Sequence, residues 1–95
     1  MKKIYISGPI KGYADGNIKA FKNAQIKLEG ENYLVTNPFE ITPDTELTYE
    51  EYMRYDIRAL TFCDVIYMLK GWEQSKGANL ELNVAKAIGL KIIYE

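Results

Sequence analysis

The chain has 95 residues, with 12 Lys and Arg, 13 Asp and Glu, one Cys and no His, and its formal net charge is -1. Without His there is no Ser-His-Asp triad, no Cys-His pair and no histidine metal ligand. One Cys excludes an internal disulfide, a cysteine-rich zinc site and an iron–sulfur cluster. Nucleic acid is not an expected partner, because such domains neutralise phosphates with an excess of Lys and Arg. Any chemistry must use carboxylates, hydroxyls, amides, backbone groups or lysine.

The length predicts a single domain over residues 1–95. The hydrophobic share of 47% and the charged share of 26% are ordinary for a soluble globular protein. The first apolar run ends at Ser7-Gly8-Pro9, too early for a signal-peptide core. No segment approaches the roughly 20 apolar residues of a membrane span. We therefore expect a cytoplasmic protein with no membrane partner.

The first half of the chain predicts strand, helix, strand and loop. Residues 3–7 form a short strand that stops at Gly8-Pro9. Residues 17–30 form a helix with Asn17 as its N-cap and Gly30 as its stop. The apolar face of that helix consists of Ile18, Phe21, Ala24, Gln25 and Leu28. A strand follows over residues 33–36, and residues 39–47 have no periodicity and are expected to be loop.

The second half begins with Thr48 followed by Glu51, a capping box that predicts a helix over residues 49–62. Its apolar stripe consists of Tyr49, Tyr52, Met53, Ile57 and Leu60. The continuous apolar run over residues 64–69 indicates a buried parallel strand. Residues 70–76 are expected to be loop, residues 78–88 a helix that stops at Gly89, and residues 90–94 a last strand.

This alternation predicts a small three-layer α/β fold of the flavodoxin or Rossmann type. The expected parallel sheet has about four strands, with helices on both faces. Ligands of such sheets bind beyond the carboxyl ends of the strands, where the strand order reverses. The candidate site therefore lies after residues 3–7 and 64–69.

Two acids interrupt otherwise apolar helix faces near that site. Glu81 shares a stripe with Ala78, Ala85 and Ile88, and Asp56 lies on the apolar face of the preceding helix. Two carboxylates facing one crevice would suit paired functional groups. The simpler alternatives remain open. Glu81 could be a partly solvated acid near a helix N-terminus, and Asp56 could pair with one of its neighbouring arginines.

The remaining candidates lie in the strands and loops around these acids. The helix start at Ser75-Lys76-Gly77 offers free backbone N–H groups that suit an anion. Trp72 is either a lid or stacking platform for a base, or a packing anchor. Tyr5 and Cys63 taken alone are expected to be core residues.

Four segments, in this order, resemble the nucleoside 2-deoxyribosyltransferase-like superfamily, which includes the 2'-deoxynucleoside 5'-monophosphate N-glycosidases and short uncharacterised bacterial and phage domains. They are Lys3-Ile-Tyr-Ile-Ser-Gly-Pro-Ile-Lys-Gly12, Asn37-Pro38, Asp56 eight positions before Asp64, and Ser75-Lys-Gly-Ala-Asn-Leu-Glu81. The resemblance covers nearly the whole chain.

The resemblance implies a role for each matching residue. Glu81 would be the nucleophile at the anomeric carbon, Asp56 the acid/base near the leaving nucleobase, and Tyr5 the residue that orients Glu81. The substrate would be bound by Ser7, Gly8, Pro9, Ile10, Gly12, Trp72, Ser75 and Gly77. A serine at position 75 suits a 5'-phosphate, so the implied partner is a nucleoside monophosphate. No metal and no cofactor are required.

The chemistry would be cleavage of an N-glycosidic bond, with water as acceptor in a hydrolase or a second base in a transferase. A noncatalytic module that senses or sequesters a nucleotide is the alternative, and a small interaction domain without a ligand is a third hypothesis. Larger members of the superfamily continue beyond the fourth strand. We therefore expect the missing wall of the site to come from residues 39–47, from Trp72 or from a second subunit in a homodimer or larger oligomer.

Overall fold

The computed structural model describes residues 1–43 and 45–95. Asp44, which falls within the expected loop over residues 39–47, lies outside the described residues. Four strands, β1 (Lys3–Ser7), β2 (Leu34–Thr36), β3 (Val65–Met68) and β4 (Lys91–Tyr94), form a parallel sheet in the order β2-β1-β3-β4. The chain runs outward from β1 to β2 and then crosses to β3. The strand order therefore reverses between β1 and β3, where ligands of such sheets bind.

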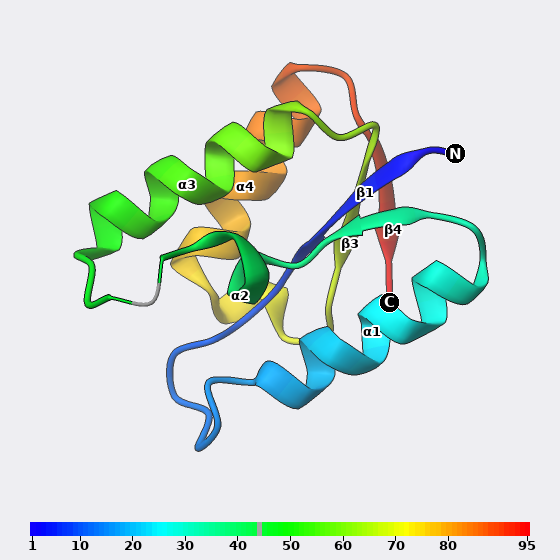
Figure 1. Cartoon of the computed structure of the whole chain (residues 1–95). Helices are drawn as coiled ribbons and strands as arrows, with labels where there is room; N and C mark the ends of the chain where they lie inside the picture. The colour runs from blue at the N-terminus through cyan, green and yellow to red at the C-terminus, as the bar shows by residue number, and fades with distance from the viewer. Residues whose placement is uncertain (44) are drawn as a thin grey trace.

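Helices cover both faces of the sheet. Figure 1 shows α1 (Ile18–Gly30) on one face, and α3 (Tyr49–Thr61) and α4 (Lys76–Ala87) on the other. Side chains alternate between the two faces along each strand. Ile4 and Ile6 pack in the core beneath α1, whereas Tyr5, Ile66 and Met68 pack beneath α3 and α4. The predicted three-layer α/β fold is confirmed.

The ends of the helices around the site follow the sequence signals closely. Thr48 and Glu51 form both hydrogen bonds of the predicted capping box at the start of α3. Helix α4 begins at Lys76, slightly earlier than expected, because the Ser75 hydroxyl accepts the N–H of Ala78 and serves as its N-cap. Past the end of α4, Gly89 takes the left-handed conformation (φ 79°) that favours glycine there.

The predicted start of α1 is confirmed in position, with Asn17 as the N-cap residue, but two of its details differ. Asn17 makes no side-chain cap, because its backbone is left-handed (φ 67°) and its amide donates instead to the carbonyl of Pro9. Ile18 is 46% exposed, so the core face of the helix begins at Phe21. The expected stop at Gly30 is confirmed, although the left-handed residue beyond the helix is Asn32 (φ 69°).

The expected loop over residues 39–47 is wrong at its start, where the structure has α2 (Pro38–Ile41). The Asn37 side chain caps this helix by accepting the N–H of Phe39, and proline suits the first helical position because its missing N–H has no partner to lose. The Phe39 ring meets the Phe21 ring edge-on at 5.1 Å.

Within residues 70–76, Trp72–Gln74 form a short 3-10 helix, η1.

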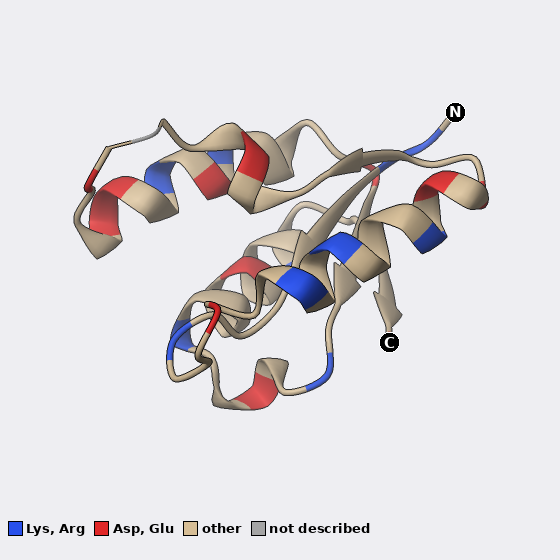
Figure 2. Cartoon of the chain, turned by 60° about the horizontal axis from the view of Figure 1, so that its bottom comes forward, with Lys and Arg blue, Asp and Glu red and all other residues tan. Residues whose placement is uncertain are grey.

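The surface carries both signs of charge. Figure 2 shows basic and acidic positions interspersed along α1 and α3. Ion pairs join Lys22 to Glu40 at 4.0 Å and Lys27 to Glu31 at 3.0 Å, and all four side chains are at least half exposed, so each pair contributes little to stability. No helix in residues 1–43 and 45–95 has the length and apolar character needed to cross a bilayer.

Candidate active site

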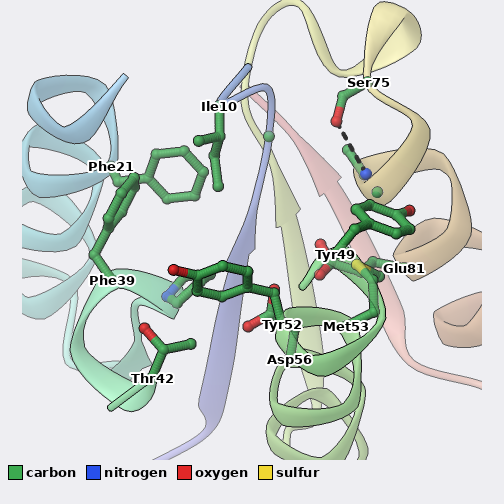
Figure 3. Close-up of a pocket in the computed structure, with 14 residues that line it drawn as sticks. Ile10, Phe21, Phe39, Thr42, Tyr49, Tyr52, Met53, Asp56, Ser75 and Glu81 are labelled. Atoms are coloured by element: carbon green, nitrogen blue, oxygen red, sulfur yellow. Dashed lines mark hydrogen bonds between the residues drawn. The ribbon is translucent and has the colours of Figure 1, made fainter. Parts of the chain in front are cut away.

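A cavity of about 380 Å³ lies beside the carboxyl end of β1, among α2, α3 and α4. This volume lies in the range of small-molecule sites, roughly 300–1,000 Å³. Figure 3 shows Phe21, Phe39 and Ile10 on one side and Ser75 and Glu81 on the other. The cavity therefore has an apolar aromatic end and a polar end, separated by residues of α3.

Glu81 is the most enclosed acid of the cavity, with 5% of its surface exposed. The Tyr5 hydroxyl donates to Glu81 Oε2 at 2.8 Å, and the Ser7 hydroxyl donates to Glu81 Oε1 at 2.6 Å. Tyr5 and Ser7 alternate with Ile4 and Ile6 along β1 and so point to the α4 side of the sheet. Glu81 is therefore a buried, oriented carboxylate, and the alternative of a partly solvated acid is wrong.

Asp56 lines the same cavity from α3 and is 8% exposed. Its Oδ1 atom is buried and has no hydrogen-bond partner within the described part of the chain. In the same part of the chain, neither Arg54 nor Arg58 forms an ion pair with it. A buried carboxylate oxygen without a partner is costly. The structure thus replaces the arginine-paired alternative with a buried acid that lines the cavity and has the Glu81 carboxyl group as its neighbour.

Burial changes the acidity of both carboxyl groups. Desolvation raises the pKa of Asp56 to about 6, and a side-chain hydrogen bond with Glu81 opposes that rise. Desolvation also raises the pKa of Glu81 to about 8; the Ser7 and Tyr5 hydrogen bonds oppose that rise, and the neighbouring Asp56 adds to it. Two interacting acids titrate as a pair. The pair therefore holds one proton near neutral pH, and Tyr5, whose pKa burial raises well above 10, keeps its proton.

The start of α4 forms the polar mouth of the cavity, which Ser75 and Gly77 line. The N–H groups of Lys76 and Gly77 lie too early in the helix to find an intrahelical acceptor. The Asn79 side-chain amide donates to the carbonyls of Trp72, Glu73 and Ser75 and so fastens the preceding turn to α4. The Ser75 hydroxyl accepts the Ala78 N–H and still has its own proton to donate.

The other expected site residues are divided between the cavity and its surroundings. Gly8 and Ile10 line the cavity. A Cβ at Gly8 would come within 2.7 Å of Leu69 Cβ, so packing against β3 also requires glycine there. Pro9 and Gly12 lie in the same loop outside the lining.

Trp72 also lies outside this cavity. Its ring packs against Tyr94 at 5.8 Å, beside a second cavity of about 480 Å³ next to β4. The structure therefore places Trp72 as a packing residue against β4.

Residues that the sequence did not assign to the site supply most of the apolar wall. They are Phe21, Pro38, Phe39, Thr42, Tyr49, Tyr52, Met53 and Ala78. Tyr49, Tyr52 and Met53 precede Asp56 by seven, four and three residues, and this helical spacing on α3 is the signal that could have identified them. Within the described residues, no group of three or more His, Cys, Asp or Glu is arranged to hold a metal ion.

Solved structures define the class of fold. A 2-deoxyribosyltransferase from Leishmania mexicana superimposes with a TM-score of 0.77 at 21% identity, covering 99% of this chain and 63% of that one. A 2-deoxyribosyltransferase from Bacillus psychrosaccharolyticus gives 0.75 at 19% identity, covering 97% and 70%. A conserved protein from Enterococcus faecalis gives 0.74 at 23% identity, covering 99% and 62%. The chain thus has the Rossmann-like fold of the deoxyribosyltransferases, as the resemblance predicted.

The family follows from the sequence itself. Residues 2–94 match the model of the family described as "Domain of unknown function (DUF4406)", and the chain belongs to that family. None of the curated proteins matches the sequence significantly. The chain spans less than two thirds of the length of the Leishmania enzyme.

Proposed function

We propose that this chain cleaves the N-glycosidic bond of a (deoxy)nucleoside 5'-monophosphate, with Glu81 as the nucleophile and Asp56 as the acid/base. One observation carries the proposal. Glu81 is buried, receives one hydroxyl hydrogen bond on each carboxylate oxygen, and shares a cavity with Asp56, a second buried acid. This is the pairing that displacement at an anomeric carbon requires, and the deoxyribosyltransferase fold supports it.

In the proposed first step, a Glu81 oxygen attacks C1' of the sugar while the bond from C1' to the base nitrogen breaks. The reactive form of the pair has its one proton on Asp56 and leaves Glu81 ionised, so the base departs with the electron pair of that bond and takes the proton from Asp56. Each Glu81 oxygen accepts one hydroxyl and retains a second lone pair for C1'. Tyr5 and Ser7 act as positioning residues, since both are fully buried and reach Glu81 rather than the cavity.

In the second step, water attacks C1', the Glu81 carboxylate leaves, and the Asp56 carboxylate takes a proton from the water. A second base in place of water would give transfer of the sugar. The base would occupy the apolar end formed by Phe21 and Phe39, and the phosphate would accept from Ser75 and from the N–H groups at the start of α4. The proposed donor set requires no metal or cofactor.

The test is incubation with a panel of nucleoside and deoxynucleoside 5'-monophosphates, with chromatography of released base. We expect release from at least one monophosphate and its loss in Glu81→Ala. The matched control is Glu73→Ala, which changes an exposed glutamate of η1 and should retain activity. Binding of a monophosphate without release of base would favour the noncatalytic nucleotide-binding module instead.

A further inference from the structure

Lys76 is an exposed residue that stands in the sequence between Ser75 and Gly77, the two residues of the cavity mouth assigned to the phosphate. It is the first residue of α4, a helix of 12 residues with no acid in its first turn. A positive side chain is unfavourable at a helix N-terminus, because the free N–H groups already give that end a partial positive charge. In residues 1–43 and 45–95 no acid forms an ion pair with Lys76. The Lys76 ammonium and the partial positive charge of the helix N-terminus therefore lie together, with no acid paired to Lys76 in the described residues.

The Lys76 ammonium lies over the ring of Tyr49, a residue that lines the cavity. Its Nζ lies 4.9 Å from the centroid of the Tyr49 ring, within the range of a cation–π interaction. Tyr49 lines the cavity, and a Cβ at Gly77 would lie 3.9 Å from the Tyr49 hydroxyl oxygen. The ring therefore stands over the first turn of α4, as Figure 3 shows for Tyr49, Glu81 and Ser75. The Lys76 ammonium is thus held at a ring of the cavity wall that lies beside the first turn of α4.

A second observation indicates that this cavity binds a ligand. Asp56 lines the same cavity although only 8% of it is exposed, and within the described residues its one polar neighbour is the Glu81 carboxyl group, with no N–H donor on its buried Oδ1 atom. A buried acceptor of this kind is satisfied when a ligand supplies a donor. The ligand would then extend from Asp56 to the positively charged mouth. The end of the ligand at that mouth must carry negative charge.

We propose that Lys76 determines specificity for a 5'-phosphorylated substrate. Its ammonium forms a charge-assisted hydrogen bond with the phosphate dianion, and the Tyr49 ring holds it there. This inference rests on the proposed function, because it assigns the phosphate end of the same cavity. Ser75 and Gly77 alone would contribute only uncharged donors, whereas Lys76 adds the full charge that distinguishes a monophosphate from its nucleoside.

The test compares Lys76→Met with the wild type on a nucleoside monophosphate and on the matching nucleoside. Loss of a hydrogen bond between charged groups should raise KM for the monophosphate by about tenfold to a hundredfold. The kcat for the monophosphate and the kcat/KM for the nucleoside should stay within about twofold. Lys76→Arg should restore the low KM, because arginine keeps the charge and also stacks on aromatic rings. The matched control is Lys86→Met at the other end of α4, which should leave both substrates unaffected.

Calorimetric titration separates this proposal from the proposed function. If the wild type releases no base from any substrate, the proposed function fails, but Lys76 is still tested by binding. A monophosphate that binds at least about tenfold more weakly to Lys76→Met, with nucleoside binding unchanged, supports the role of Lys76. Equal affinity of both proteins for the monophosphate, an equal loss for both ligands, or no binding of either ligand to the wild type overturns it.

Discussion

The burial of the Glu81 carboxyl group predicts a specific dependence of stability on pH. The pKa of Glu81 is about 8 in the fold against 4.5 for an ordinary glutamate, chiefly through desolvation. Above pH 4.5 the unfolded chain loses this proton while the folded chain retains it until about pH 8, so the free energy of unfolding falls as pH rises through that interval. Over the roughly three pH units from 5 to 8, at about 1.4 kcal/mol per unit, the loss is up to about 4 kcal/mol.

Glu81→Gln removes the titration and preserves the shape of the side chain. Relative to the wild type, the variant should gain up to about 4 kcal/mol of unfolding free energy between pH 5 and pH 9. The assay is urea unfolding followed by circular dichroism at pH 5, 7 and 9. Other groups near Glu81, including Tyr5, Tyr49 and Asp56, are present in both proteins and contribute mainly to the shared part of the curves. Glu73→Gln is the control and should parallel the wild type. Parallel curves for Glu81→Gln and the wild type would show that the pKa of Glu81 is not raised in the fold.

Three further predictions concern the site and the assembly. Ser7→Ala and Tyr5→Phe each remove one donor to Glu81, so kcat should fall about tenfold to a hundredfold with KM nearly unchanged; wild-type kcat in both variants would contradict their positioning role. The rate should be bell-shaped in pH between about 6 and about 8, because Asp56 and Glu81 must together hold one proton; a rate that keeps rising to pH 10 would argue against the pair. The homodimer expected from the sequence should appear in sedimentation at micromolar concentration, and a species with the mass of one chain would contradict it.

The sequence predicts the layers of this fold because each long helix and strand shows the spacing of apolar residues that is typical of its secondary structure. The continuous apolar run of β3 is buried, and so are Leu60 of the α3 stripe and Ala78 and Ala85 of the α4 stripe. Tyr49, Tyr52 and Ile88 of the same stripes are 40%, 38% and 48% exposed, so the predicted faces are only partly buried. Glu81 and Asp56 stand out for the same reason, since each interrupts an apolar stripe. Their burial without an arginine partner, however, depends on how α3 packs on α4, which the sequence pattern does not specify.

The missed features are short or depend on contacts between distant segments. Helix α2 has only four residues, too few to show a helical period, and its only local signal is Asn37-Pro38. It supplies Pro38 and Phe39, two of the wall residues that the sequence leaves unassigned. Trp72 turns to Tyr94 on β4, a contact across 22 positions that no local pattern records.

Ser7 is an intermediate case. Its position two residues after Tyr5 on one strand places both hydroxyls on the same face of the sheet. The sequence therefore predicts that the two side chains point the same way. That both reach Glu81, one to each oxygen, follows only from the position of α4 beside β1.

The most direct test of the central claim is the capture of the Glu81 intermediate. The protein is mixed with a 5'-monophosphate whose sugar carries a 2-fluoro substituent, which slows hydrolysis of a sugar–enzyme ester, and the intact mass is then measured. The account predicts a mass increase of one sugar phosphate, located on the peptide that contains Glu81 and absent from Glu81→Gln. Release of base with no adduct at Glu81, or the same adduct in Glu81→Gln, would contradict it.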